Sequence, residues 1–128
     1  MHARERIESY YDALRTEEPL GPYFAAADPG DDDPVKFGIS ERLVGADAIR
    51  TGLRRQTETT TDWTVTSRAL RVAERDRHAW FSDDVSMAWT DAATGDRRAF
   101  ETRWSGALER RDGEWRFVGM HVSTADEL

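Results

Sequence analysis

The second half of the chain alternates apolar and polar residues with a period of two, and this pattern most constrains the fold. It runs through four segments rich in β-branched and aromatic residues, at 63–74, 79–90, 97–110 and 115–123. Turn residues separate these segments, and the Asp112-Gly113 pair in the last joint is a strong β-hairpin signal. The sequence therefore predicts a meander of four long antiparallel strands.

The first half of the chain predicts helices instead. Between residues 3 and 16, the apolar side chains Ile7, Tyr10, Tyr11 and Leu14 recur every three or four positions, which is typical of one face of a helix. A short strand at 35–39 and a second helix at 46–57 are expected next. Helices followed by a meander favour one α+β domain over residues 1–128, with the helices on one face of a curved sheet.

Composition excludes several classes of function. The net charge is −7, with acidic residues mixed among the arginines, which argues against nucleic acid as a partner. The chain has no cysteine, its three histidines lack metal-ligand spacing, and its glycines form no phosphate or dinucleotide loop, so we expect neither a metal nor another cofactor. Lys36 is the only lysine among 18 basic residues, an imbalance typical of a GC-rich genome or of salt adaptation.

Nothing in the sequence predicts a membrane segment. The first residues are charged and amphipathic instead of forming an apolar signal core, and no apolar run approaches the length that spans a bilayer. We therefore expect an acidic cytoplasmic protein that does not bind membranes.

The C-terminal stretch resembles a known family. Arg103-Trp104-Ser105, then Asp112-Gly113-Glu114-Trp115, then His121-Val122-Ser123 is similar to the pattern Arg-x-Thr, Asp-Gly-x-Trp and His-x-Ser in SnoaL-like members of the NTF2-like superfamily. Segment 37–49 also looks like their connection from strand to helix. This chain has Ser105 where threonine is usual and Gly119 where many relatives carry a second histidine.

The resemblance implies a particular α+β architecture, the NTF2-like cone. A curved antiparallel sheet would wrap around the N-terminal helices and enclose an internal cavity, and the outer face of the sheet would pair with a second copy to form a homodimer. In this superfamily the cavity serves isomerases, cyclases, dehydratases, ligand binders and assembly modules, so the fold alone assigns no reaction.

His121 and Arg103 are the candidate catalytic residues. His121 is the only histidine inside an expected central strand, and imidazole can exchange a proton near neutral pH. Arg103 would hold a carboxylate or enolate oxygen. The alternatives are a structural histidine and an arginine exposed on the outer face.

Whether these two side chains meet depends on the register of the last hairpin. A two-residue turn at Asp112-Gly113 would place Trp104 opposite His121, whereas a three-residue loop beginning at Arg111 would place Arg103 there. We favour the three-residue loop, because it brings Arg103 onto the face of His121 and Ser123, as in the relatives.

Six further residues are candidates for ligand contacts. A tyrosine on the first helix would offer a hydroxyl donor to a ligand oxygen, and the aromatic side chains would line an apolar wall. Core packing is the alternative for each aromatic residue, and for Trp89 so is a dimer interface. The candidates are Tyr10, Tyr11, Phe37, Trp89, Trp104 and Ser123.

Two functions follow from these expectations. The first is a SnoaL-like protein that binds a small apolar or weakly acidic molecule, with cofactor-free isomerase or cyclase-type proton transfer in which His121 is the base and Arg103 or a tyrosine is the stabiliser. The second is a non-catalytic self-association module with a vestigial pocket.

Overall fold

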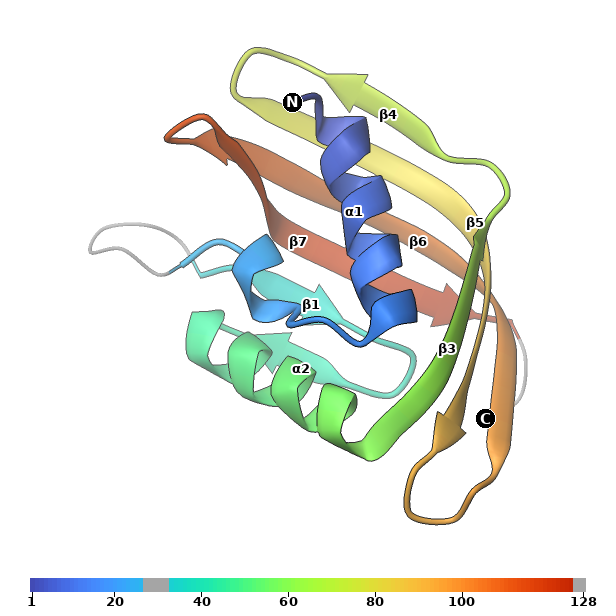
Figure 1. The fold of residues 1–128 in the computed structure, drawn as a ribbon. Coiled ribbons are helices and arrows are strands. Elements are labelled where there is room, and N and C mark those ends of the chain that lie inside the picture. Colours follow the sequence, from blue (N-terminus) through green and yellow to red (C-terminus); the bar gives the residue numbers. More distant parts are fainter. Residues whose placement is uncertain (27–32, 126–128) are drawn as a thin grey trace.

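A computed structural model describes residues 1–26 and 33–125, and its elements follow the predicted order of helices before strands (Figure 1). The helices are α1 (Ala3–Thr16), the short 3-10 helix η1 (Gly21–Tyr23) and α2 (Ala46–Thr59). The strands are β1 (Val35–Phe37), β2 (Arg42–Val44), β3 (Thr60–Ser67), β4 (Arg71–Glu74), β5 (His78–Asp91), β6 (Arg97–Arg111) and β7 (Glu114–Thr124).

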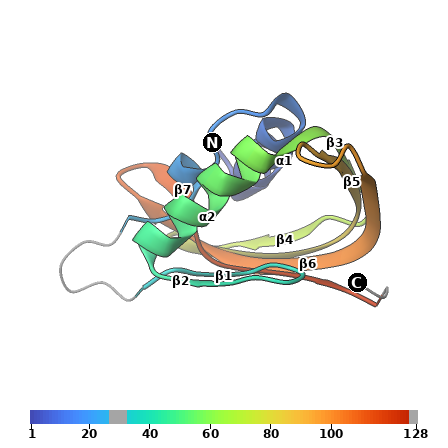
Figure 2. The same cartoon turned by 90° about the horizontal axis from the view of Figure 1, so that it is seen from below.

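The strands form one curved sheet in the order β2-β1-β7-β6-β5-β3, with β4 pairing with β5 off this path. The β1–β7 pair is parallel and the other pairs are antiparallel, so the sheet is mixed. Both helices lie on the concave side of the sheet (Figure 2). The predicted α+β arrangement is confirmed.

Helix α1 lies across the concave face because its apolar stripe needs burial. Ile7, Tyr10 and Leu14 are all buried on this stripe. The ring of Tyr10 contacts Trp104 and Phe117 of the sheet edge-to-face, with ring centroids 6.2 and 5.3 Å apart. Such aromatic pairs stabilise a core beyond the area they bury. These contacts fix the position of α1 on the concave face of the sheet.

The predicted strand at 63–74 is two strands in the structure, β3 and β4, separated by a bend. The carboxylate of Asp83 on β5 accepts hydrogen bonds from the Ser67 hydroxyl, at 2.6 Å, and from the backbone N–H of Ala69, at 2.9 Å. These bonds hold the chain away from straight strand geometry. An alternating pattern does not show such a bend, because the acceptor comes from a distant segment.

The last hairpin closes with a two-residue turn. Asp112 and Gly113 both have positive φ, 51° and 79°, and Arg111 pairs with Glu114. Two successive positive φ angles suit the right-handed twist of a hairpin, and glycine adopts them without strain. The three-residue loop that we favoured is therefore wrong, and the alternative turn is the one that forms.

A β-bulge then shifts the register of the same hairpin. Val118 is an extra residue on β7, so His121 lies opposite Ser105. Neither predicted partner of His121, Arg103 or Trp104, is correct. A bulge moves all later side chains of its strand to the other face, because the side-chain period of a strand is two.

The bulge explains why β7 changes faces along its length. Trp115 and Phe117 are buried against the core before the bulge, and Met120 and Val122 are buried after it. His121 is exposed on the outer face. The two halves of the strand therefore follow opposite parities.

Candidate functional site

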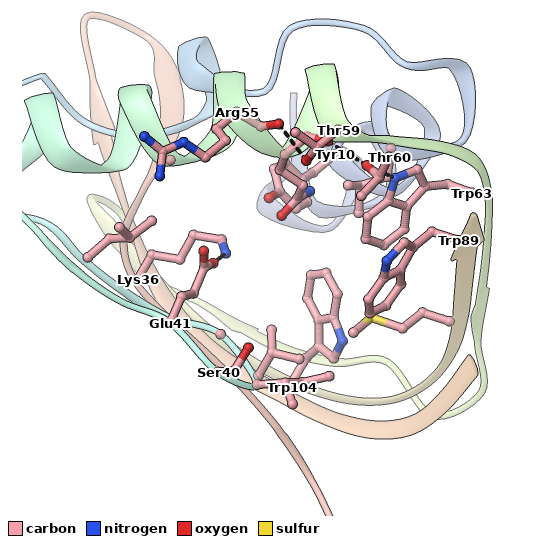
Figure 3. Close-up of a pocket in the computed structure, with 18 residues that line it drawn as sticks. Tyr10, Lys36, Ser40, Glu41, Arg55, Thr59, Thr60, Trp63, Trp89 and Trp104 are labelled. Carbon is pink, nitrogen blue, oxygen red and sulfur yellow. Dashed lines mark hydrogen bonds and ion pairs between the residues drawn. The ribbon is translucent and has the colours of Figure 1, made fainter. Parts of the chain in front are cut away.

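A pocket of about 470 Å³ lies between the helices and the concave face of the sheet (Figure 3). Residues from α1, α2, the β1–β2 hairpin and the long strands line it. Those that matter for its chemistry are Tyr10, Lys36, Glu41, Trp63, Trp89 and Trp104. A volume of this size suits a small organic molecule.

Three indole rings form the apolar wall of the pocket. Trp63 and Trp89 stack with centroids 4.8 Å apart and planes at 21°, and Trp104 is 5% exposed. The N–H groups of two rings are already bonded, since Trp63 donates to Thr60 at 2.8 Å and Trp104 donates to Thr102 at 2.9 Å. These two rings therefore offer a ligand their carbon surfaces.

The opposite end of the pocket carries an ion pair between a buried lysine and a half-buried glutamate. Lys36 is the central residue of β1 and alternates with the outward-facing Val35 and Phe37, so its side chain points to the concave side and is 5% exposed. Its ammonium group pairs with the carboxylate of Glu41, which follows in the β1–β2 turn. A buried ammonium needs such a partner, because an isolated buried charge is strongly destabilising.

Gly38 allows this pair to form. A Cβ atom at this position would lie 2.6 Å from Cγ of Glu41 and 2.7 Å from its Oε1. Real side chains do not approach so closely, so any larger residue would push the carboxylate aside. The glycine therefore makes room for Glu41 to fold back toward Lys36.

Tyr10 adds a neutral hydroxyl to the pocket. The side chain is 1% exposed, and burial raises the pKa of the phenol above its ordinary value, with a further increase from the negative charge of Glu41. Among the described residues, its hydroxyl has no hydrogen-bond partner. It is thus an available O–H donor at any physiological pH.

Three of the residues selected from the sequence line this pocket, namely Tyr10, Trp89 and Trp104. Tyr11 does not line the pocket. It is buried, and its hydroxyl donates to the carboxylate of Asp83 on β5 at 2.8 Å. Its role in the structure is to hold α1 against the sheet.

The other four selected residues, His121, Arg103, Ser123 and Phe37, do not line the pocket. The bulge in β7 places His121 and Ser123 on the convex face of the sheet, where Arg103 pairs with Ser123 across the strands. Phe37 is 37% exposed and contacts the His121 ring edge-to-face, with centroids 6.1 Å apart. His121 and Arg103 thus share a region of the outer face, outside the pocket.

Sequence reasoning missed both members of the ion pair. Lys36 carries a signal, because it is the only lysine in a chain whose other basic residues are all arginines. Glu41 has no comparable signal, since its position depends on the turn around Gly38.

Known structures define the class of this fold. The chain superposes on a candidate dehydratase of the NTF2-like family from Streptomyces avermitilis with a TM-score of 0.83, at 12% identity, over 97% of this chain and 94% of that one. A ketosteroid isomerase-like protein from Erwinia carotovora atroseptica matches with a TM-score of 0.76, at 17% identity, over 97% and 94%. At these identities the similarity shows the fold alone, and the fold is the predicted NTF2-like α+β cone.

A third similar structure is a candidate scytalone dehydratase from Novosphingobium aromaticivorans, with a TM-score of 0.80, 13% identity and coverage of 96% of this chain and 81% of that one. The sequence itself matches the model of the SnoaL-like domain over residues 4–127. The chain belongs to the SnoaL-like domain family, as its last hairpin indicated. A search of curated protein sequences found no significant match.

The described residues contain no helix that is both long enough and apolar enough to cross a membrane.

Proposed function

We propose that the pocket binds a small, largely apolar molecule that carries a polar oxygen. Three indoles supply apolar surface at one end, while the charged pair Lys36 and Glu41 lies at the other end (Figure 3). Pockets that bind small molecules commonly combine an apolar lining with a few placed polar groups. The expected ligand is therefore a ring compound with a carbonyl or hydroxyl group at one end.

We further propose that the pocket catalyses proton transfer without a cofactor. The observation that carries this proposal is the ion pair between the buried Lys36 and the half-buried Glu41 in the pocket. The Glu41 carboxylate would take a proton from a carbon next to the ligand carbonyl, and the electron pair of the broken C–H bond would move to the carbonyl oxygen. The Lys36 ammonium and the Tyr10 hydroxyl would stabilise the resulting enolate oxygen.

The comparisons are consistent with this type of activity. Similar structures include proteins named as candidate dehydratases and one named as ketosteroid isomerase-like. The sequence-based assignment of His121 as base and Arg103 as stabiliser stays a prediction. Their positions outside the pocket favour Glu41, Lys36 and Tyr10 for these roles.

Binding is tested first, by titrating 2-naphthol and 1-tetralone against tryptophan fluorescence, because three indoles line the site. We expect saturable quenching for wild-type protein. Lys36→Met should weaken binding about tenfold, the effect of losing one charge-assisted hydrogen bond. Arg42→Gln, an exposed change on the neighbouring strand, is the matched control. Equal affinities in all three proteins would refute the proposed orientation.

Proton transfer is tested separately, by following deuterium exchange at the carbon next to the carbonyl of 1-tetralone with NMR. Glu41→Gln keeps the shape of the side chain and should abolish the protein-dependent exchange while 2-naphthol still binds. His121→Ala should leave the exchange unchanged. If His121→Ala abolishes exchange and Glu41→Gln does not, the sequence-based assignment is the correct one.

Self-association is the second candidate function, and exposed apolar side chains on the outer face of the β1–β2 hairpin favour it. Phe37 is 37% and Val44 40% exposed. These residues would let two copies meet through the outer face, as expected from the family resemblance. Light scattering of wild-type protein and of Phe37→Ser tests this: a wild-type dimer that the variant loses would support it, and a wild-type monomer at high concentration would exclude it.

A further inference from the structure

A second hollow, of about 310 Å³, lies on the outer face of the sheet, away from the pocket. One row of its side chains crosses four neighbouring strands in register. Arg71 of β4 pairs with Ser82 of β5, Ser82 with Ser105 of β6, and Ser105 with His121 of β7. Adjacent strands lie about 4.8 Å apart, so these donors follow one another at close spacing.

A second row runs beside the first. Asp84 of β5 pairs with Arg103 of β6, and Arg103 pairs with Ser123 of β7. All three residues line the hollow. We call the two rows together the outer groove, and its members are Arg71, Ser82, Asp84, Arg103, Ser105, His121 and Ser123.

In the outer groove as the structure describes it, charged donor groups without a hydrogen-bond partner outnumber charged acceptor groups without one. Among the residues that the structure describes, the guanidinium groups of Arg71 and Arg103 have no hydrogen bond or ion pair. The carboxylate of Asp84 has none either, and it is the only uncommitted acid of the groove. Asp83, which also borders the hollow, already accepts three hydrogen bonds from protein groups. The charges of Arg71 and Arg103 are therefore offset formally by Asp83 and Asp84, but the Asp83 side chain is buried and committed to protein donors, whereas both arginines are exposed and uncommitted.

We propose that the outer groove binds a phosphoryl group, either as free phosphate or as a small phosphate monoester. Two guanidinium groups match the oxygens of a dianion in geometry and charge, and serine hydroxyls can donate to the remaining oxygen. His121 adds an N–H donor in either neutral tautomer. Asp84 opposes the anion, and its repulsion sets the limit on affinity.

A second copy of the chain is a poorer occupant of this part of the outer face. It would bury the charged groups of Arg71, Asp84 and Arg103, and burying unpaired charges costs more than their contacts return. A small anion supplies the missing charge and leaves the groove open to water.

The test is a titration of ¹⁵N-labelled full-length protein with inorganic phosphate at constant ionic strength, followed by NMR. We expect saturable shifts at the amides of Ser82, Ser105 and His121. Arg103→Gln should weaken the affinity about tenfold, as loss of one charge-assisted bond implies. Arg98→Gln, an exposed change of equal charge on the same strand outside the groove, should leave the affinity unchanged.

Asp84→Asn should tighten phosphate binding several-fold, because it removes the exposed opposing charge. Methyl phosphate separates the two sources of the phosphoryl group. An affinity equal to that of inorganic phosphate assigns a monoester, and a tenfold weaker affinity assigns free phosphate. Both outcomes support the outer groove as the binding site. Shifts that do not saturate, or equal losses in Arg103→Gln and Arg98→Gln, would overturn the proposal as non-specific screening. Shifts confined to the Lys36 region would overturn it in favour of the pocket.

Discussion

Asp83→Ala is expected to release the junction that ties α1 to the bend between β3 and β4. Asp83 is 3% exposed. One oxygen accepts from the Tyr11 hydroxyl at 2.8 Å and from the Ser67 hydroxyl at 2.6 Å, and the other accepts from the backbone N–H of Ala69 at 2.9 Å. The side chain of Asp83 on β5 thus holds two segments distant in sequence, α1 and the bend at 67–69.

The expected cost follows from what each donor can do without Asp83. Tyr11 is 2% exposed, so its hydroxyl loses its acceptor and gains no water, which costs about 2 kcal/mol. Ser67 and Ala69 lie nearer the surface and can turn to water, so each loses about 1 kcal/mol. The free energy of unfolding should therefore fall by about 4 kcal/mol, a large share of the ~5–15 kcal/mol typical of a domain.

Urea unfolding followed by circular dichroism measures this change, provided that the slope with urea stays constant. Asp84→Ala is the control, since this exposed neighbour should cost no more than about 0.5 kcal/mol. In the double variant with Tyr11→Phe, the two effects should fall short of additivity by ~1–2 kcal/mol, because both remove the same bond. A loss below ~1 kcal/mol for Asp83→Ala, or strict additivity, would refute the reasoning.

Two further predictions concern the helix stripe and the β1–β2 turn. Burial raises the pKa of Tyr10 and of Tyr11, whereas unfolded tyrosine titrates near pH ~10. The unfolded chain alone loses these protons, so the free energy of unfolding should fall above about pH 10 by ~1.4 kcal/mol per pH unit per tyrosine. Tyr11→Phe should halve this fall in the free energy of unfolding per pH unit, measured by urea unfolding at a series of alkaline pH values. An unchanged fall would contradict the prediction. Gly38→Ala should displace Glu41 and slow 1-tetralone exchange about tenfold or more with little change in stability; an unaltered rate would contradict it.

The fold was predictable because each element carries its own period. The helix at 3–16 has the predicted bounds, and the long strands are placed to within three residues at their ends except where β3 and β4 separate. The apolar period of a helix or strand depends only on residues close together in the sequence. The apolar face of each element is then buried against the core. Strand β2 was not predicted, because three residues are too few to show an alternating pattern.

The candidate site was less predictable, because it depends on parity and on contacts between distant segments. The residue Val118 turns His121 from the inner face to the outer one, and nothing in the local sequence marks it as an extra residue. Lys36 meets Glu41 only because Gly38 gives that side chain room. Such features arise from backbone geometry, whereas alternation reports only which residues are apolar.

The β1–β2 hairpin sits at the edge of the sheet and joins it through one parallel pairing with β7. It supplies the charged end of the pocket, while the indoles come from β3, β5 and β6. The ion pair and the indoles of the pocket therefore come from separate segments of the chain. Protein engineers can exchange the segment 35–44 to retune the chemistry at the charged end while the aromatic wall and the folding core keep their sequence.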